Sequence, residues 1–110
     1  MAGGRDIARR LAAEGVGTVF LLIAVVGSGI MGQRLSGGND AIALLANAIA
    51  TGATLVVLIS IFGPVSGAHF NPLVSVGAIL RREMPSRDGL LYILTQLAAA
   101  IVGVWLAHAM

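Results

Sequence analysis

The sequence contains no cysteine, no lysine and little charge of either sign. Without cysteine there is no disulfide, no thiolate nucleophile and no thiolate metal site. Charged residues make up 11% of the 110 residues, hydrophobic residues make up 57%, and the mean hydropathy is +0.94. Soluble domains contain about 25% charged residues. The composition therefore excludes a soluble protein and indicates a single membrane-embedded unit.

The basic residues are all arginines, and the formal charge is +2. A basic balance can indicate a nucleic-acid partner, but these arginines stand at the ends of apolar runs, where they set membrane orientation. With a cytoplasmic N-terminus only Arg34 lies outside, and the others lie inside: Arg5, Arg9, Arg10, Arg81, Arg82 and Arg87. This count requires the segment between Phe62 and Arg81 to enter the membrane and return to the same side. We expect an integral protein of the plasma (inner) membrane.

Three apolar runs are long enough to cross a bilayer, since a hydrocarbon core of about 30 Å needs roughly 20 helical residues. They are residues 7–30, 41–62 and 90–109. A cleaved signal peptide is the less favoured interpretation of the first run, because Glu14 lies inside it and intact spans follow. A fourth run, 73–80, gives together with Pro72 only about 14 Å of helix. The expected fold class is an all-α membrane protein, with three transmembrane helices plus one re-entrant half-helix (about 65–80), as one repeat over residues 1–110.

Turn and capping residues predict where these helices begin and end. We expect Asp40 to cap the second span and Ser86 to cap the third. Gly63 and Pro64 are expected to end the second span, because proline lacks an N–H and clashes with the preceding turn.

The half-helix has a strong start signal in Asn71 at the N-cap and Pro72 at the first helical position. Gly67, just before it, allows backbone conformations that are closed to other residues. The unpaired N–H groups and the positive dipole end of this helix would point at the membrane centre. Non-helical backbone at such a depth is tolerated only inside protein or along a watery cavity. We expect a watery cavity.

Three motifs in the chain resemble one known family. SGAHFNPLVSV, residues 66–76, is similar to the first signature loop of the aquaporin and glycerol-facilitator family, the major intrinsic proteins. AEGVGT, residues 13–18, and YILTQLAAAIVG, residues 92–103, resemble family motifs of the first and third helices. The resemblance covers nearly the whole chain and only the N-terminal half, or first repeat, of a family member. The family's second Asn-Pro-Ala loop and the arginine after it have no counterpart in this sequence.

The resemblance implies passive flow of water or small neutral solutes such as glycerol, selected by hydrogen-bond geometry and helix dipoles. The implied pore motif is Asn71, Pro72 and Leu73, with Leu73 in place of the family's alanine and the NH₂ group of Asn71 donating to the permeating molecule. Glu14 and Gln96 are implied to be buried polar scaffold residues, with Glu14 accepting hydrogen bonds from loop N–H groups. The implied pore-lining residues are His69, Thr51, Gly67, Ala68 and Phe70.

Two side-chain patterns add to this interpretation. Asn47, Thr51 and Thr54 share one face of the second span and mark either hydrogen bonding between helices or a pore wall. By family spacing Thr51 replaces an aromatic residue of the outer filter, which would make that filter wider and more polar. On the third span a seam of small residues predicts close packing, with lipid contact as the alternative: Ala99, Gly103 and Ala107.

The implied partners are the lipid bilayer, water and small neutral solutes, a complementary second repeat and, by family resemblance, a tetramer of whole channels; no nucleic acid is expected. Two other function classes stay open. One is a non-conducting repeat that packs against full-length channels. The other is a secondary-transporter repeat, which ranks last because Glu14 is the only intramembrane acid. Ser66 and His69 have no carboxylate nearby to orient them, so we expect no catalytic residue, no enzyme activity, no cofactor and no metal site.

Overall fold

Four helices make up residues 2–109, the part of the chain that the computed structural model describes. They are α1 (Ala2–Leu35), α2 (Asp40–Ser66), α3 (Pro72–Leu80) and α4 (Ser86–Ala109). No strand occurs in these residues, so the all-α class is confirmed for them. Three stretches are long and apolar enough to cross a membrane, which is the expected number of spans: Asp6–Leu35, Asp40–Ser66 and Ser86–Ala109. Met1 and Met110, the limits of the expected repeat, and the side chain of Arg5 lie outside what is described.

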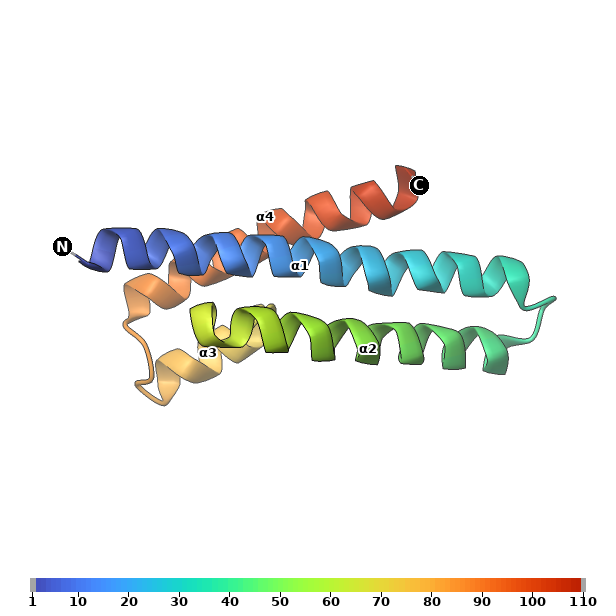
Figure 1. Ribbon diagram of the computed structural model, residues 1–110, viewed down its shortest axis with the longest axis horizontal. Helices are drawn as coiled ribbons and strands as arrows, with labels where there is room; N and C mark the ends of the chain where they lie inside the picture. Colours follow the sequence, from blue (N-terminus) through green and yellow to red (C-terminus); the bar gives the residue numbers. More distant parts are fainter. Residues whose placement is uncertain (1, 110) are drawn as a thin grey trace.

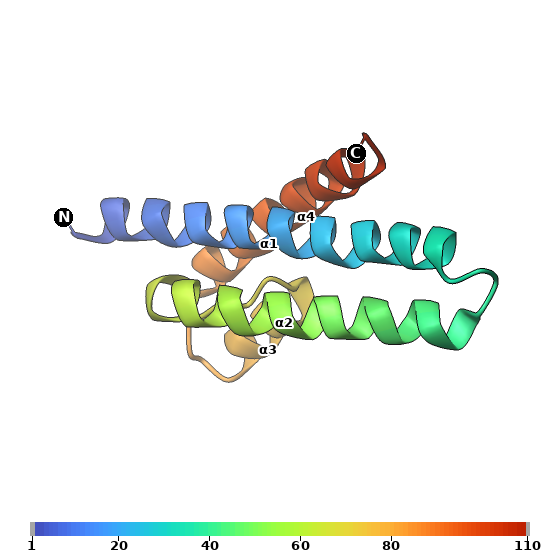
Figure 2. The ribbon, with the colours of Figure 1, turned by 45° about the vertical axis from the view of Figure 1, so that its right-hand side comes forward.

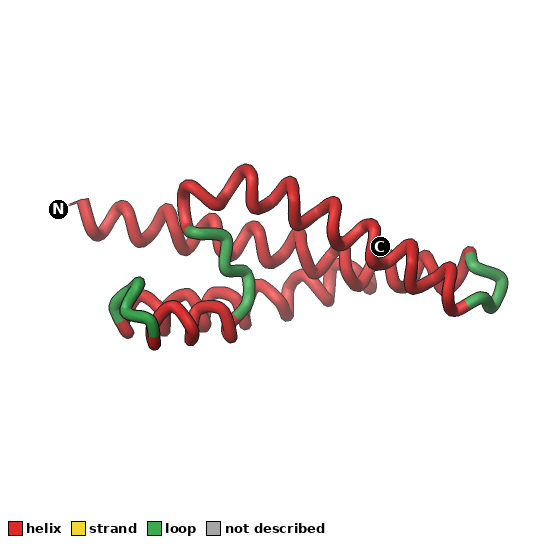
Figure 3. Tube along the Cα trace, turned by 90° about the horizontal axis from the view of Figure 1, so that it is seen from below, coloured by secondary structure: helices red, strands yellow, loops and turns green. Residues whose placement is uncertain are grey.

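The helix α1 is the centre of the bundle. It packs along α2, which runs antiparallel to it, and also against α4, which crosses it obliquely (Figure 1). The short α3 packs on α4 and lies near the C-terminal end of α2 (Figure 2). Short loops join the helices at residues 36–39, 67–71 and 81–85 (Figure 3).

The second span ends later than predicted. Gly63 and Pro64 do not end α2, which continues through both of them to Ser66. It stops where Gly67 takes a left-handed φ of 88°, with the Gly67 N–H donating to the Gly63 carbonyl at 2.9 Å. The proline removes one hydrogen bond, which a membrane helix can tolerate, so the left-handed glycine decides the end of the helix.

The two predicted caps are each wrong by one residue. Asn39 caps α2 in place of Asp40, since its Oδ1 accepts a hydrogen bond from a first-turn N–H at 3.2 Å. Asp40 lies inside the first turn, where its negative charge interacts favourably with the positive end of the helix dipole. Ser86 is the first residue of α4, because the carbonyl of Pro85 already accepts the first helical N–H, that of Gly89, at 3.0 Å.

The seam of small residues on α4 is buried, as predicted. A Cβ atom at Gly103 would lie 2.8 Å from Cβ of Leu22 and 2.9 Å from the carbonyl oxygen of Val19, both on α1. Only glycine therefore permits this approach of the two helix backbones. The lipid-facing alternative for this seam is wrong at Gly103.

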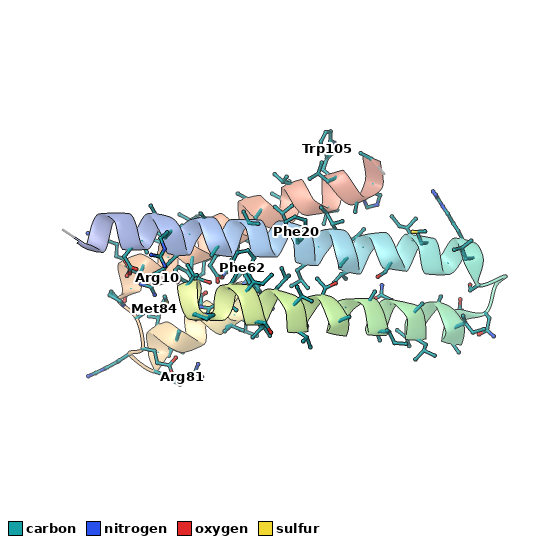
Figure 4. The ribbon with its side chains drawn as sticks, viewed as in Figure 1. Arg10, Phe20, Phe62, Arg81, Met84 and Trp105 are labelled. Atoms are coloured by element: carbon teal, nitrogen blue, oxygen red, sulfur yellow. The ribbon has the colours of Figure 1, made fainter. Side chains whose placement is uncertain are left out.

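The core of the bundle contains buried polar side chains among apolar ones, and its exterior is apolar. The largest fully buried side chains are Tyr92, Gln96, Glu14, Thr18 and Ser75. Large hydrophobic side chains lie outside, among them Leu44, Ile101 and Trp105 with 71%, 72% and 68% of their surface exposed, and Trp105 extends away from the bundle (Figure 4). Soluble proteins have the opposite distribution, so this exterior suits lipid or another protein better than water.

Candidate functional site

The loop between α2 and α3 has an unusual backbone. Gly67, Ala68 and Phe70 have φ values of 88°, 53° and 50°. The left-handed region costs a residue with a side chain roughly 1–2 kcal/mol, so two strained residues within four positions require support from the surrounding structure. The residues that supply this support define the candidate site.

Glu14, on α1, provides most of that support. Its Oε2 accepts hydrogen bonds from Oγ of Ser66 at 2.6 Å and from the N–H of His69 at 3.1 Å. Its Oε1 accepts from the N–H of Phe70 at 2.8 Å and from Nε2 of Gln96 at 2.7 Å. The side chain is fully buried. An acidic residue at the centre of a span costs around 3 kcal/mol on membrane-insertion scales, and the four donors offset a cost of this kind.

Ser75 connects the loop to α4. Its Oγ accepts a hydrogen bond from Nε2 of Gln96 at 3.1 Å and is hydrogen-bonded to Nδ1 of His69 at 2.9 Å. The imidazole ring also lies against the ring of Tyr92, with centroids 5.1 Å apart. The side chain of His69 therefore points into the bundle.

Tyr92 connects the network to Arg10, which lies toward the end of the bundle where α1 and α4 begin (Figure 4). The hydroxyl of Tyr92 donates to the carbonyl of Ser66 at 2.8 Å and accepts from Nε of Arg10 at 2.9 Å. Arg10, Ser75 and Tyr92 had no predicted role in the site. Sequence spacing offered a signal for two of them, because Arg10 stands four residues before Glu14 and Tyr92 stands four before Gln96, each on the same helix face.

Asn71 lies on the open side of the loop. Its Oδ1 accepts a hydrogen bond from the N–H of Leu73 at 2.8 Å, which caps α3 in the way that the Asn-Pro pair predicts. The side-chain NH₂ of Asn71 has no acceptor within residues 2–109, and the residue is exposed. Leu73 is 77% exposed beside it, and Pro72 is half-buried.

The other loop residues have mixed positions. Phe70 is buried, with its ring against Gly17 of α1 and edge-on to Phe62, the two ring centroids being 6.2 Å apart. Gly67 is exposed and Ala68 is half-buried. The side chain of Phe70 thus packs between helices, and the open surface of the loop consists of backbone together with Asn71.

The polar stripe on α2 lies apart from this network. Nδ2 of Asn47 donates to the carbonyl of Val25 on α1 at 2.8 Å, which is a hydrogen bond between helices. Oγ1 of Thr51 lies 3.4 Å from Oδ1 of Asn47, and Thr54 donates to the carbonyl of Ala50 at 2.8 Å. Within the described residues no hydrogen bond joins Thr51 to the loop.

Three long apolar helices with an apolar exterior and buried polar side chains between them define an integral membrane protein. Comparison of sequences assigns the family: the chain belongs to the Major intrinsic protein family, whose sequence profile matches residues 3–110. It is 54% identical over 105 residues to "Aquaglyceroporin AqpS" of Rhizobium meliloti (strain 1021), covering 96% of this chain and 45% of that protein. It is 38% identical over 98 residues to "Probable aquaporin TIP2-2" of Oryza sativa subsp. japonica, covering 87% of this chain and 40% of that protein.

A third relative is "Aquaporin Z" of Brucella melitensis biotype 1, 34% identical over 92 residues, which cover 84% of this chain and 40% of that protein. The chain thus spans less than half the length of these relatives. No solved structure matches it at a significant level.

Proposed function

We propose that the chain is the first half of an aquaporin-like channel for passive flow of water and small neutral solutes such as glycerol. One observation carries the proposal: Glu14 holds the loop from inside the bundle, while the NH₂ group of Asn71 at the start of α3 is left free for a solute. The names of the relatives, aquaporins and an aquaglyceroporin, support the same function.

In this proposal the loop and α3 form a re-entrant hairpin inside the membrane. Val65, before the loop, and Glu83, after α3, line the same cavity of about 230 Å³, which supports a chain that enters and returns. The nine residues of α3 would cover about half of the bilayer core. The six-to-one distribution of arginines supports a cytoplasmic N-terminus in the inner membrane.

Solute selection would use the open surface of the loop. Asn71 would donate to the oxygen of a water or hydroxyl, next to Pro72 and Leu73. The side chains of His69 and Phe70 point inward, so these residues would contribute their backbone carbonyls, as would Gly67 and Ala68; no donor within residues 2–109 binds these oxygens. The positive end of α3 would disfavour cations at the centre of the pore and interrupt proton hopping.

A complementary second repeat would complete the pore, and whole channels would assemble as tetramers. An antiparallel second copy of this chain is a poor substitute, because dual insertion needs near-balanced charge on the two sides of the membrane. Without a partner, the N-terminal groups of α3 would also face lipid unpaired, at several kcal/mol each.

The test is stopped-flow light scattering on vesicles that contain the chain, the chain with the second repeat of a full-length relative, or neither. We expect water and glycerol flux above the level of empty vesicles only when both halves are present. Asn71→Ala should lower that flux, and Asn39→Ala, which removes the cap of α2, is the matched control. Absence of flux from the pair would favour the non-conducting interaction protein, and strong water flux from the chain alone would contradict the need for a second half.

A further inference from the structure

We propose that Arg10 is a positioning residue that acts through Tyr92 to hold the end of α2 and, with it, the loop that the proposed function places in the pore. The connection runs from Nε of Arg10 to the hydroxyl of Tyr92 at 2.9 Å, and from that hydroxyl to the carbonyl of Ser66 at 2.8 Å. The role of Arg10 in conduction rests on the proposed function, but its role in the geometry of the loop does not.

Tyr92 contacts the loop at two points. Its hydroxyl satisfies the carbonyl of Ser66, the last residue of α2, which has no partner within the helix. Its ring lies 5.1 Å from the ring of His69, further along the loop. Tyr92 is fully buried, so its hydroxyl cannot exchange these partners for water.

Arg10 orients that hydroxyl. Its guanidinium carbon lies 5.4 Å from the centroid of the Tyr92 ring, and its Nη1 lies 3.8 Å from a carboxylate oxygen of Asp88 on α4. The Nε donation occupies the acceptor side of the hydroxyl and directs its proton toward Ser66.

Ser66 carries the effect into the loop. Its Oγ donates to Glu14 and accepts from the N–H of Ala68 at 3.1 Å. The next two N–H groups, of His69 and Phe70, both donate to Glu14. A shift of Ser66 therefore disturbs the acceptors of consecutive loop amides, which makes their solvent exchange a direct measure of the connection.

The test is hydrogen–deuterium exchange on the full chain in lipid nanodiscs. Tyr92→Phe keeps the ring and removes the hydroxyl, and Arg10→Gln removes the guanidinium. In each variant we expect the loop amides of residues 67–70 to exchange about fivefold faster, as the loss of one net hydrogen bond predicts. Arg9→Gln, at the neighbouring exposed arginine, is the matched control and should leave the loop unchanged.

The double variant separates positioning from general packing. Because Arg10 is proposed to act through the hydroxyl, Arg10→Gln added to Tyr92→Phe should cause no further acceleration in the loop, and amides of α2 between Ile42 and Leu58 should keep their wild-type rates. Additive acceleration, or an unchanged loop in Arg10→Gln, would overturn the proposal.

Water flux of the same variants with the second repeat should fall in parallel. If the wild-type chain and the second repeat together conduct nothing, the proposed function is contradicted. The role of Arg10 in loop geometry is not, since the exchange result does not depend on conduction.

Discussion

At the scale of single residues, Glu14 organises the site. One carboxyl group on α1 receives donors from the end of α2, from the loop and from α4. Three of these donors are N–H groups, which can only donate, so the group at position 14 must offer acceptors in several directions. A carboxylate does so because both of its oxygens are acceptors.

Glu14→Gln should therefore be strongly destabilising although it changes the shape of the side chain little. The new NH₂ group would face N–H donors, and the free energy of unfolding should fall by roughly 3 kcal/mol, the range for lost hydrogen bonds to a charged group. Titration of the purified chain with sodium dodecyl sulfate, followed by circular dichroism, measures this change. Glu83→Gln, the same substitution at an exposed ion pair with Arg81, should cost less than about 1 kcal/mol. Equal effects of the two variants would contradict the role of Glu14.

Thr51 tests the filter assignment. If it stands at the outer filter, Thr51→Phe narrows the pore, so glycerol flux should fall more than water flux in vesicles that contain both halves. Ile49→Phe is the matched control. Ile49 lies two positions before Thr51, so it is on the opposite side of α2. Water flux without glycerol flux, unchanged by Thr51→Phe, would count against the assignment.

At the scale of helices, local signals predicted much and tertiary contacts decided the rest. Asn71 and Pro72 predicted the start of α3, because capping and a fixed φ act within a few residues of chain. The prediction ends α2 too early, at Gly63 and Pro64. Proline is a strong local signal for a helix end, but the bundle tolerates the hydrogen bond that Pro64 removes. The donors that meet Glu14 come from residues more than fifty positions away, and only the family resemblance implied that loop N–H groups would be among them.

The close contact between α1 and α4 predicts that the same substitution, glycine to alanine, changes the free energy of unfolding in opposite directions at two positions. Gly103→Ala places a Cβ atom against backbone and Cβ atoms of α1, and such overpacking should lower the free energy of unfolding by about 1–3 kcal/mol. Gly52→Ala on α2 meets nothing within 4 Å and should raise it by roughly 0.5–1 kcal/mol through helix propensity. The same detergent titration measures both variants, and a neutral Gly103→Ala would show that the seam is looser than described.

At the scale of the whole molecule, the absence of cysteine makes topology directly testable. Val65→Cys and Arg82→Cys each introduce a single thiol, before the loop and after α3. If the hairpin is re-entrant, a membrane-impermeant maleimide should label both from the cytoplasmic side. Ser36→Cys, in the loop between α1 and α2, should be labelled from the other side. Labelling of Val65→Cys and Arg82→Cys from opposite sides would mean that the segment crosses the membrane.

The position of Glu14 in the chain also has a consequence for biosynthesis. Its donors are added 52 residues later at Ser66 and 82 residues later at Gln96. At a translation rate of about 5–20 residues per second, the last donor is added roughly 4–16 seconds after Glu14. Until then the carboxyl of α1 lacks at least one of its partners in the finished bundle. We therefore expect α1 to stay beside the insertion machinery and to settle into the membrane only after α4 has been made.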